Sequence, residues 1–255
     1  MDVRGKALEI EQQGDGDAVL MVHGLGGTSN VWYAQRGVLA RSFRVICPDL
    51  EGSGRSPLAG ELSIAGFVAD MMALLDALAV DTAHLVGHSM GTIVCQHIAA
   101  VHSDRVKSLA LLGPLAEPPE TARKPLRDRA ITAREKGMAV IADTMLPLST
   151  SAETRASRLA ATAMVRELLM RQSADGYAKT CEALAAARSA DLERIMCPAI
   201  LITGDEDGVG PPAAVKRLAQ RIKGARTVVL TGVGHWTPIE RPNAVNEALL
   251  NFYFG

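Results

Sequence analysis

Short apolar runs alternate along the chain with longer segments whose apolar positions recur at helical spacing. Each run is closed by Gly, Pro, His or Asp and predicts one strand: residues 18–22, 43–47, 83–86, 108–112, 199–203 and 227–230. Positions of helical period predict helices between them: residues 64–78, 92–101, 213–221 and 243–252. Strands that alternate with helices favour an α/β fold, with a mostly parallel twisted sheet covered by helices on both faces.

This alternation stops over residues 116–194. The stretch contains no run of β-branched residues and is rich in Ala, Arg, Glu and Met, a composition that favours helices. Thr150 and Glu153 form a capping-box pattern that predicts the start of one such helix. We therefore expect an α/β core made of residues 1–115 and 195–255, with residues 116–194 inserted as a helical cap, or lid.

The composition argues against some classes of binding partner and favours others. The 255 residues are 48% hydrophobic, which suffices for the large core of one domain with an insertion. With 27 basic against 28 acidic residues the net charge is -1, so no overall field attracts nucleic acid or an anionic membrane. We expect a small-molecule substrate. No apolar run approaches the roughly 18 residues of a membrane span, and no secretion signal is evident, so a cytoplasmic protein is expected.

The sequence offers no pattern for a metal or a cofactor. Its four cysteines, Cys47, Cys95, Cys181 and Cys197, lack CxxC spacing and lie in or beside apolar segments. This placement is typical of small buried side chains, so we expect neither a disulfide nor a zinc site. The glycine-rich segment 23–27 lacks both the GxGxxG spacing and a Walker lysine, so no nucleotide cofactor is expected.

The strongest candidate for chemistry is Ser89, in the segment Gly87-His88-Ser89-Met90-Gly91. The segment follows a predicted strand and precedes a predicted helix, which is the context of a nucleophile elbow. Its two glycines omit the side chains that a sharp turn cannot accommodate, so the hydroxyl is exposed above the sheet. The backbone N–H of Met90 then faces the negative charge that develops on the substrate. The alternative is a glycine-bounded turn with an inert serine.

A serine nucleophile needs a base, and His235 fits that role best among the six histidines. It lies in a glycine-containing loop between the last predicted strand and the C-terminal helix, at the sheet edge where ligands bind in open α/β folds. His84, His97 and His102 are expected in a strand, in a helix or at the surface. His88 is expected to support the elbow.

An acid that orients the imidazole is expected after the strand at residues 199–203. Three candidates follow that strand directly: Asp205, Glu206 and Asp207. For each of them, a turn with a solvated acid is the alternative. Position favours Asp207, because Asp205 lies so close to the strand end that it has little freedom to reach His235.

The loop at residues 23–27, which reads HGLGG, is the candidate for the second oxyanion donor. Small residues allow the backbone to approach a substrate closely. We expect the N–H of Leu25 to act together with that of Met90, and His23 to brace the loop through hydrogen bonds.

These segments together resemble the α/β-hydrolase superfamily over nearly the whole chain. The segments in the family's order and approximate spacing are His23-Gly24-Leu25-Gly26-Gly27, Asp49-Leu50-Glu51-Gly52-Ser53-Gly54-Arg55-Ser56, Gly87-His88-Ser89-Met90-Gly91, Gly204-Asp205-Glu206-Asp207 and Gly234-His235-Trp236. The resemblance implies the α/β-hydrolase fold, with an eight-stranded sheet, a helical cap, a Ser-His-Asp triad and an acyl-enzyme mechanism. It also implies Asp207 as the acid, three residues after Gly204.

The cap is most similar to that of 3-oxoadipate enol-lactonases. The similar segments are Lys136-Gly137-Met138-Ala139, Leu146-Pro147 and Ala174-Asp175-Gly176-Tyr177-Ala178. Those enzymes usually have a tryptophan in the cap that contacts substrate, whereas the two tryptophans here, Trp32 and Trp236, are expected in the core. Glu51 stands where the family more often has arginine or proline, which changes the charge expected near the pocket entrance.

The sequence thus predicts a serine hydrolase, a carboxylesterase or lactonase that needs no cofactor. Ser89 is the expected nucleophile, His235 the base and Asp207 the orienting acid, with the N–H groups of Leu25 and Met90 as the oxyanion hole. One alternative is a carbon–carbon bond hydrolase that uses the same triad. Another is a small-molecule receptor of this fold with a slow triad. The oligomeric state is not predicted.

Overall fold

The computed structural model describes residues 1–255, which fold around a seven-stranded sheet. The strand order is β3-β5-β4-β6-β7-β8-β9, and every neighbouring pair except β3 and β5 is parallel. The strands are β3 (Ile10–Gln13), β4 (Asp17–Val22), β5 (Phe43–Pro48), β6 (Ala83–His88), β7 (Val106–Leu112), β8 (Ala199–Gly204) and β9 (Arg226–Leu230). All six predicted strands are present, and the predicted α/β fold is confirmed.

The N-terminal strands do not join this sheet. β1 (Asp2–Val3) and β2 (Lys6–Ala7) pair only with each other, so the eight strands implied by the resemblance are wrong by one. Between them, Arg4 and Gly5 have φ angles of 57° and 75°. This left-handed pair turns the chain back on itself before it can extend along the edge of the sheet.

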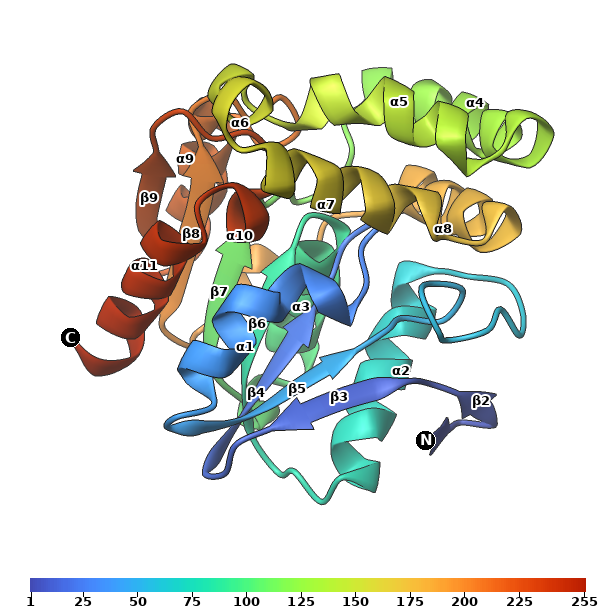
Figure 1. Ribbon diagram of the computed structural model, residues 1–255. Helices are drawn as coiled ribbons and strands as arrows, with labels where there is room; N and C mark the ends of the chain where they lie inside the picture. Colours follow the sequence, from blue (N-terminus) through green and yellow to red (C-terminus); the bar gives the residue numbers. More distant parts are fainter.

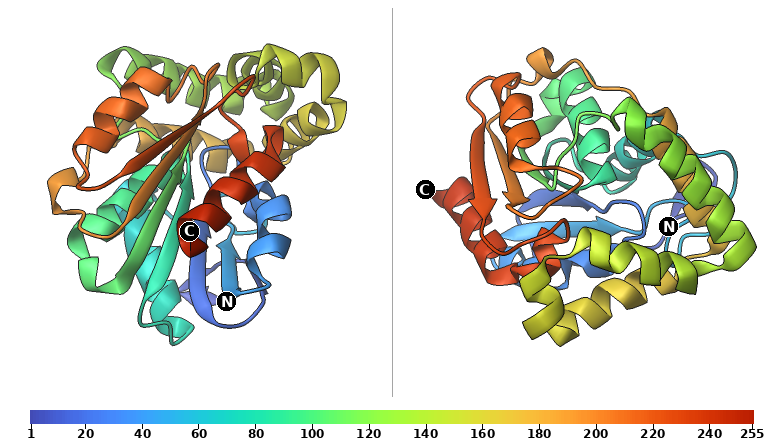
Figure 2. Two further views of the ribbon diagram at one scale, coloured as in Figure 1. Left: turned by 90° about the vertical axis from the view of Figure 1, so that its left-hand side faces the viewer. Right: turned by 90° about the horizontal axis from the view of Figure 1, so that it is seen from above.

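Helices cover both faces of the sheet, as the left view of Figure 2 shows. One face carries α2 (Ile64–Ala77), α3 (Met90–Val101) and α9 (Pro212–Gln220). The other carries α1 (Tyr33–Leu39), α10 (Thr237–Glu240) and α11 (Pro242–Phe254). Three short 3-10 helices lie in the connections: η1 (Ser29–Trp32), η2 (Ser103–Arg105) and η3 (Leu192–Arg194).

The central strands are apolar throughout because both of their faces are buried. Successive strand residues point to opposite faces of a sheet. Leu20 and Leu85 accordingly belong to the apolar core beneath α2, α3 and α9, whereas Val19 and Val86 belong to the core beneath α1 and α11. This double burial accounts for the continuous apolar runs in the sequence.

The segment between β7 and β8 forms five helices. They are α4 (Glu120–Lys136), α5 (Met138–Ser149), α6 (Ala152–Ser157), α7 (Leu159–Met170) and α8 (Ala174–Ala186). Figure 1 shows these helices above the carboxyl ends of the central strands, and the view from above in Figure 2 agrees. Leu168 and Tyr177 of this segment share one apolar cluster with Val86 and Ala110 of the sheet. The inserted helices are therefore packed on the core and not attached only at their ends.

The capping box predicted at Thr150 and Glu153 is wrong by one residue. Ser151 caps α6, and its side chain accepts a hydrogen bond from the N–H of Thr154 at 3.0 Å. Thr150 instead donates its hydroxyl to the carbonyl of Leu146 at 2.6 Å, in the last turn of α5. Thr150 and Ser151 are both suitable helix caps, so the sequence alone does not show which of them begins α6. The hydroxyl of Thr150 is already bonded to α5, and Ser151 is therefore the cap.

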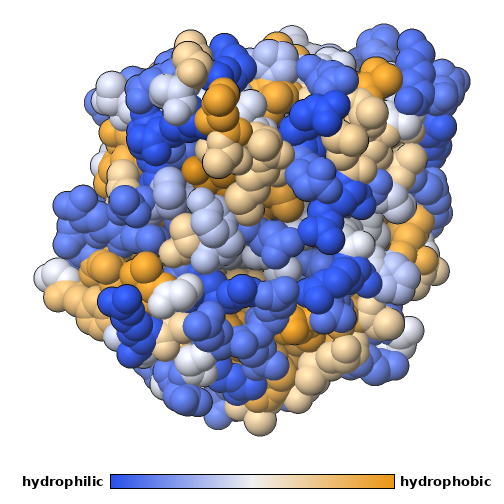
Figure 3. All heavy atoms as spheres, viewed as in Figure 1, coloured by the Kyte–Doolittle hydropathy of each residue, from blue (hydrophilic) through white to orange (hydrophobic).

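Hydrophilic and apolar residues are interspersed over the face of the molecule shown in Figure 3. The exposed large apolar side chains come from separate parts of the chain and include Tyr33, Val101, Ile131, Leu148, Leu159, Met196 and Phe254. Scattered residues of this kind are normal on a protein surface. None of the helices combines the length and the hydropathy that crossing a bilayer requires.

Candidate active site

Ser89 lies on a strained turn between β6 and α3. Its backbone angles, φ 53° and ψ -122°, fall in a region that residues with a side chain rarely adopt. The turn is held by the Ser89 N–H, which donates to Leu112 O at 2.9 Å, and by the Thr92 hydroxyl, which donates to Ser89 O at 2.6 Å. These bonds fix the Ser89 side chain at the N-terminus of α3.

The glycines on either side of Ser89 are required by close backbone contacts. A Cβ atom on Gly87 would lie 2.7 Å from the carbonyl oxygen of Gly91, and one on Gly91 would lie 2.1 Å from that of Val22. Both distances are shorter than van der Waals contact. The elbow therefore packs against itself and against the end of β4, with no room for side chains at either position.

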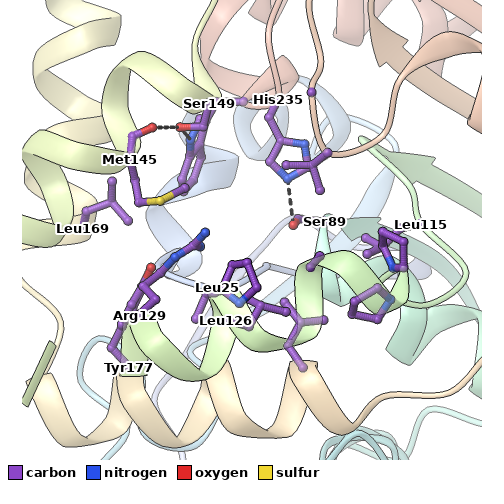
Figure 4. A pocket seen from close by; sticks show the side chains of 18 residues that line it. Leu25, Ser89, Leu115, Leu126, Arg129, Met145, Ser149, Leu169, Tyr177 and His235 are labelled. Carbon is purple, nitrogen blue, oxygen red and sulfur yellow. Dashed lines mark hydrogen bonds between the residues drawn. The ribbon is translucent and has the colours of Figure 1, made fainter. Parts of the chain in front are cut away.

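The structure brings Ser89, His235 and Asp207 together from the ends of β6, β9 and β8. The Ser89 hydroxyl lies 2.8 Å from His235 Nε2, a contact drawn in Figure 4. His235 Nδ1 lies 2.9 Å and 3.1 Å from the two carboxylate oxygens of Asp207. All three side chains are buried. Nδ1–H therefore donates to the carboxylate, and Nε2 is left to accept the hydroxyl proton.

Asp207 is held as a carboxylate. Burial alone would raise its pKa, but the neighbouring His235 and several hydrogen bonds outweigh burial and lower the pKa to about 2. The N–H groups of Val209 and Gly210 donate to Oδ1 at 2.8 Å and 2.9 Å. At neutral pH the ionised group can stabilise an imidazolium.

The two other acids of this loop have different partners. Asp205 accepts hydrogen bonds from the N–H groups of Gly232 and Val233, at 2.8 Å and 3.2 Å. Glu206 accepts one from the N–H of Ala152 at 2.9 Å. Asp205 thus links the turns after β8 and β9, Glu206 links the core to α6, and neither contacts the imidazole.

The loop after β4 passes directly beside the elbow. A Cβ atom on Gly24 would lie 2.6 Å from Ser89 Cβ and 3.2 Å from Met90 N, so only glycine fits there. The N–H of Leu25 has no hydrogen-bond partner within the chain. Met90 is the first residue of α3, where N–H groups have no partner within the helix. The N–H groups of Leu25 and Met90 are therefore two free donors, one on each side of the contact between Gly24 and Ser89.

His23 braces the same loop. Its Nε2 accepts the N–H of Leu50 at 2.9 Å, so Nδ1 carries the proton and donates to Gly24 O at 2.9 Å. Burial lowers the pKa of His23, which keeps the ring neutral. The brace fixes the end of β4 against the loop that follows β5.

Glu51 lies away from the pocket, contrary to the sequence-based expectation. It is buried, forms an ion pair with Lys6 at 2.7 Å, and accepts hydrogen bonds from the N–H groups of Ala59 and Gly60 at 2.9 Å each. The acid is turned toward the N-terminal hairpin. Its charge is neutralised there and does not act at the pocket entrance.

His88 supports the histidine loop and not the elbow alone. Its Nε2 donates to the carbonyl oxygen of His235 at 2.9 Å. Burial, together with the nearby His235, lowers the pKa of His88 to about 3. The ring is therefore neutral at physiological pH and acts as a hydrogen-bond donor to the backbone of His235.

A cavity of about 220 Å³ opens onto Ser89 and His235. Its walls are mainly apolar and include Leu25 and Trp236 of the core. The inserted helices supply others, and Figure 4 labels Leu126, Met145 and Leu169 among them. Both tryptophans lie in the core, as expected, and one of them, Trp236, also lines the pocket. The volume suits a small molecule.

A family model described as alpha/beta hydrolase fold matches residues 17–242. This chain belongs to the α/β-hydrolase family. The predicted resemblance to the family is confirmed, and with it the expectation that the protein is an enzyme.

Named enzymes are similar to this α/β-hydrolase over almost their full length. The 3-oxoadipate enol-lactonase 2 of Acinetobacter baylyi is 31% identical over 242 residues, which cover 93% of this chain and 88% of that protein. The crystal structure of the enol-lactonase from Burkholderia xenovorans LB400 has a TM-score of 0.93 at 31% identity and covers 99% of this chain and 98% of that one. A thermophilic esterase from Thermogutta terrifontis has a TM-score of 0.93 at 29% identity, with 97% and 93% covered.

This α/β-hydrolase also contains a buried carboxylate behind His235 that the sequence analysis missed. Glu240 Oε1 accepts the N–H of Trp236 at 3.0 Å, and Oε2 accepts those of Gly234 and Ser151 at 3.1 Å and 2.8 Å. Two of these donors flank His235, and the third precedes α6. One carboxylate therefore fixes both sides of the histidine and joins them to the inserted helices.

Ser149, the last residue of α5, holds the histidine loop through further bonds. The N–H of His235 donates to Ser149 O at 2.9 Å, and the indole N–H of Trp236 donates to Ser149 Oγ at 3.0 Å. The position of the imidazole thus depends on contacts from the inserted helices as well as from the core.

We expect Glu240→Gln to impair the positioning of His235. The amide places N–H donors against backbone N–H groups, so the loop that carries His235 shifts. A displacement of about 1 Å at a reacting group costs up to about 100-fold in rate, so kcat should fall about 10- to 100-fold while KM changes little. Steady-state kinetics on a 4-nitrophenyl ester measure this split.

Glu247→Gln is the matched control, because Glu247 is exposed on α11. It should leave both kinetic constants and the melting temperature unchanged. If Glu240→Gln lowers the melting temperature but the folded enzyme keeps the wild-type kcat, then Glu240 only stabilises the fold and does not position the base.

Proposed function

We propose that this hydrolase cleaves a small carboxylic ester or lactone through an acyl-enzyme on Ser89. The observation that carries the proposal is the continuous hydrogen-bonded series Ser89 Oγ, His235 Nε2 and Asp207 at the wall of a small apolar cavity. Esters and lactones are supported as the substrate class by the similarity to enol-lactonases and to an esterase.

In the acylation step, Ser89 Oγ attacks the substrate carbonyl carbon while its proton passes to His235 Nε2. The carbonyl oxygen becomes an oxyanion and accepts hydrogen bonds from the N–H groups of Leu25 and Met90. The bond to the leaving oxygen then breaks, and that oxygen takes the proton from Nε2. Asp207 stabilises the imidazolium throughout. In a lactone, the leaving alcohol remains part of the acyl group.

In the deacylation step, a water molecule attacks the acyl carbon and gives a proton to His235 Nε2. The same two N–H groups hold the second oxyanion. The bond to Ser89 Oγ breaks, and Oγ recovers its proton from Nε2. The net reaction consumes one water and releases a carboxylic acid and an alcohol. None of the proposed steps requires a cofactor.

We further propose that residues 116–194 form a cap that sets the substrate range. Leu126, Met145 and Leu169 of this segment line the cavity opposite the nucleophile. Side chains at such positions limit the size and shape of the group that reaches Ser89. Only one of the cap methionines, Met145, lines the cavity.

The proposed function is tested with a panel of 4-nitrophenyl esters of increasing acyl length together with neutral lactones. We expect turnover of the short esters and of at least one small lactone, with kcat/KM falling once the acyl chain exceeds what a cavity of about 220 Å³ can hold. Rapid mixing should show a burst of 4-nitrophenol wherever deacylation limits the rate. Folded protein that binds these compounds without turning over any of them would instead favour the receptor alternative.

A further inference from the structure

One formally charged side chain enters the cavity, and it is Arg129 on α4. Ala122, Leu126 and Arg129 all line the cavity and follow one another at intervals of four and three residues, so they share one face of the helix. No aspartate or glutamate lines the cavity. Figure 4 shows the guanidinium extending into the pocket, with Tyr177 beside it.

Arg129 forms no ion pair with any carboxylate of the chain, although other cations of α4 do. Arg123 pairs with Glu117 at 3.0 Å, and Arg134 pairs with Asp175 at 3.1 Å. Glu117 lies just before α4, and Asp175 belongs to α8. Arg127 of the same helix also lacks a carboxylate partner, but its side chain is exposed to solvent. Arg129 is therefore the arginine of α4 that faces the pocket without a counter-ion.

The immediate neighbours of Arg129 leave its charge uncompensated. Burial raises the pKa of both Tyr177 and Cys181, which lie close enough for the guanidinium to oppose that shift. Both side chains are therefore neutral at physiological pH. A half-buried guanidinium among neutral and apolar groups is unfavourable unless a ligand provides the missing negative charge.

We infer that the substrate is an anionic ester or lactone whose free carboxylate binds Arg129 while its scissile carbonyl lies at Ser89. The planar guanidinium can donate two parallel hydrogen bonds to a carboxylate, which fixes orientation as well as affinity. Both residues line the same small cavity, so one compact molecule can reach both. This inference rests on the proposed hydrolase function and names the substrate class within it.

The test compares matched pairs of substrates that differ only in a terminal carboxylate. The mono-4-nitrophenyl esters of glutaric and adipic acid are set against 4-nitrophenyl valerate and hexanoate. Wild-type enzyme should prefer at least one anionic ester to its neutral partner. Arg129→Met should lower kcat/KM for that ester by about 10- to 100-fold, the usual effect of losing one charge-assisted contact, and change the neutral esters less than about threefold.

Arg127→Met is the matched control on the same helix. Arg127 is exposed and does not line the cavity, so its replacement should leave the preference for the anionic ester unchanged. Arg129→Lys should show an intermediate loss, because the ammonium keeps the charge but not the planar pair of donors. Equal losses on anionic and neutral esters in Arg129→Met, or no loss on either, would overturn the inference.

A binding measurement separates this inference from the proposed function. Isothermal titration of glutarate and adipate into the Ser89→Ala protein reports the anion site without any turnover. Binding that disappears in Ser89→Ala/Arg129→Met supports the site even if no ester is hydrolysed by the wild type. Absence of binding to the Ser89→Ala protein contradicts the anion site even if neutral esters are hydrolysed normally.

Discussion

Ser89→Ala is expected to lower kcat on an activated ester by about four to six orders of magnitude, because no other group can form the acyl-enzyme. Folding should be unaffected. Alanine keeps the Cβ atom at the strained φ of 53° and removes only the hydroxyl, so the backbone bonds that hold the turn remain. Single-turnover kinetics on a 4-nitrophenyl ester, with circular dichroism of the same samples, measure both effects.

Ser149 provides the control for this prediction. Its hydroxyl also lines the cavity, but it bonds to Met145 O and to the indole of Trp236 and not to the imidazole. Ser149→Ala should therefore retain activity within about tenfold, since it removes contacts that support the loop and leaves the nucleophile in place. If Ser149→Ala were the inactive variant and Ser89→Ala the active one, the nucleophile would have to be reassigned.

Asp207→Asn is expected to lower kcat by about 10,000-fold, the loss seen when the acid of a serine protease triad is changed in the same way. The amide oxygen can still accept the N–H groups of Val209 and Gly210. Its NH2 group then faces Nδ1 of His235, which must accept a hydrogen bond instead of donating one. The imidazole proton moves to Nε2, where it blocks transfer from Ser89.

Asp205→Asn tests the alternative acid. An asparagine oxygen can accept the same two N–H groups that Asp205 now holds, from Gly232 and Val233. We therefore expect kcat within about threefold of wild type, as for other conservative changes away from the reacting atoms. The reverse order of the two variants, with both folded, would move the orienting role from Asp207 to Asp205.

The parts of the fold that were predictable from sequence are those with local causes. The central strands are buried on both faces, so consecutive residues of each strand are apolar and the strand can be recognised as a continuous apolar run. β3 was missed because Ile10–Gln13 is a polar edge strand with little apolar signal. The five helices of the insertion were expected only as one helical region, because their boundaries depend on how the helices pack.

The candidate site divides in the same way. Ser89 was recognisable because glycines flank it between a predicted strand and a predicted helix, and His235 because it lies in the loop between the last strand and the C-terminal helix. Asp207 could be chosen over Asp205 from its distance to the strand end, and the structure places it within 3.1 Å of the imidazole. Each of these residues follows a strand of the sheet, which is why its place in the sequence pointed to the site.

Residues whose role arises only from tertiary contacts gave no usable signal. Glu240 could have been noticed as an acid four residues after Trp236 in the first turn of a helix, but its contact with Ser151 joins distant segments. Arg129 is one of many arginines in residues 116–194, and only the folded structure shows that it faces the pocket without a counter-ion. Gly113 is similar, since a Cβ atom there would lie 2.9 Å from His235 Nδ1.

The most direct test of the account is to map the site of covalent reaction with a fluorophosphonate. The reagent is attacked by an activated serine and leaves a stable adduct in place of the acyl group. We predict one adduct per chain, located by peptide mass spectrometry at Ser89, with activity lost in proportion to labelling and no adduct in Ser89→Ala. An adduct at another serine, or full activity in protein completely labelled at Ser89, would contradict the account.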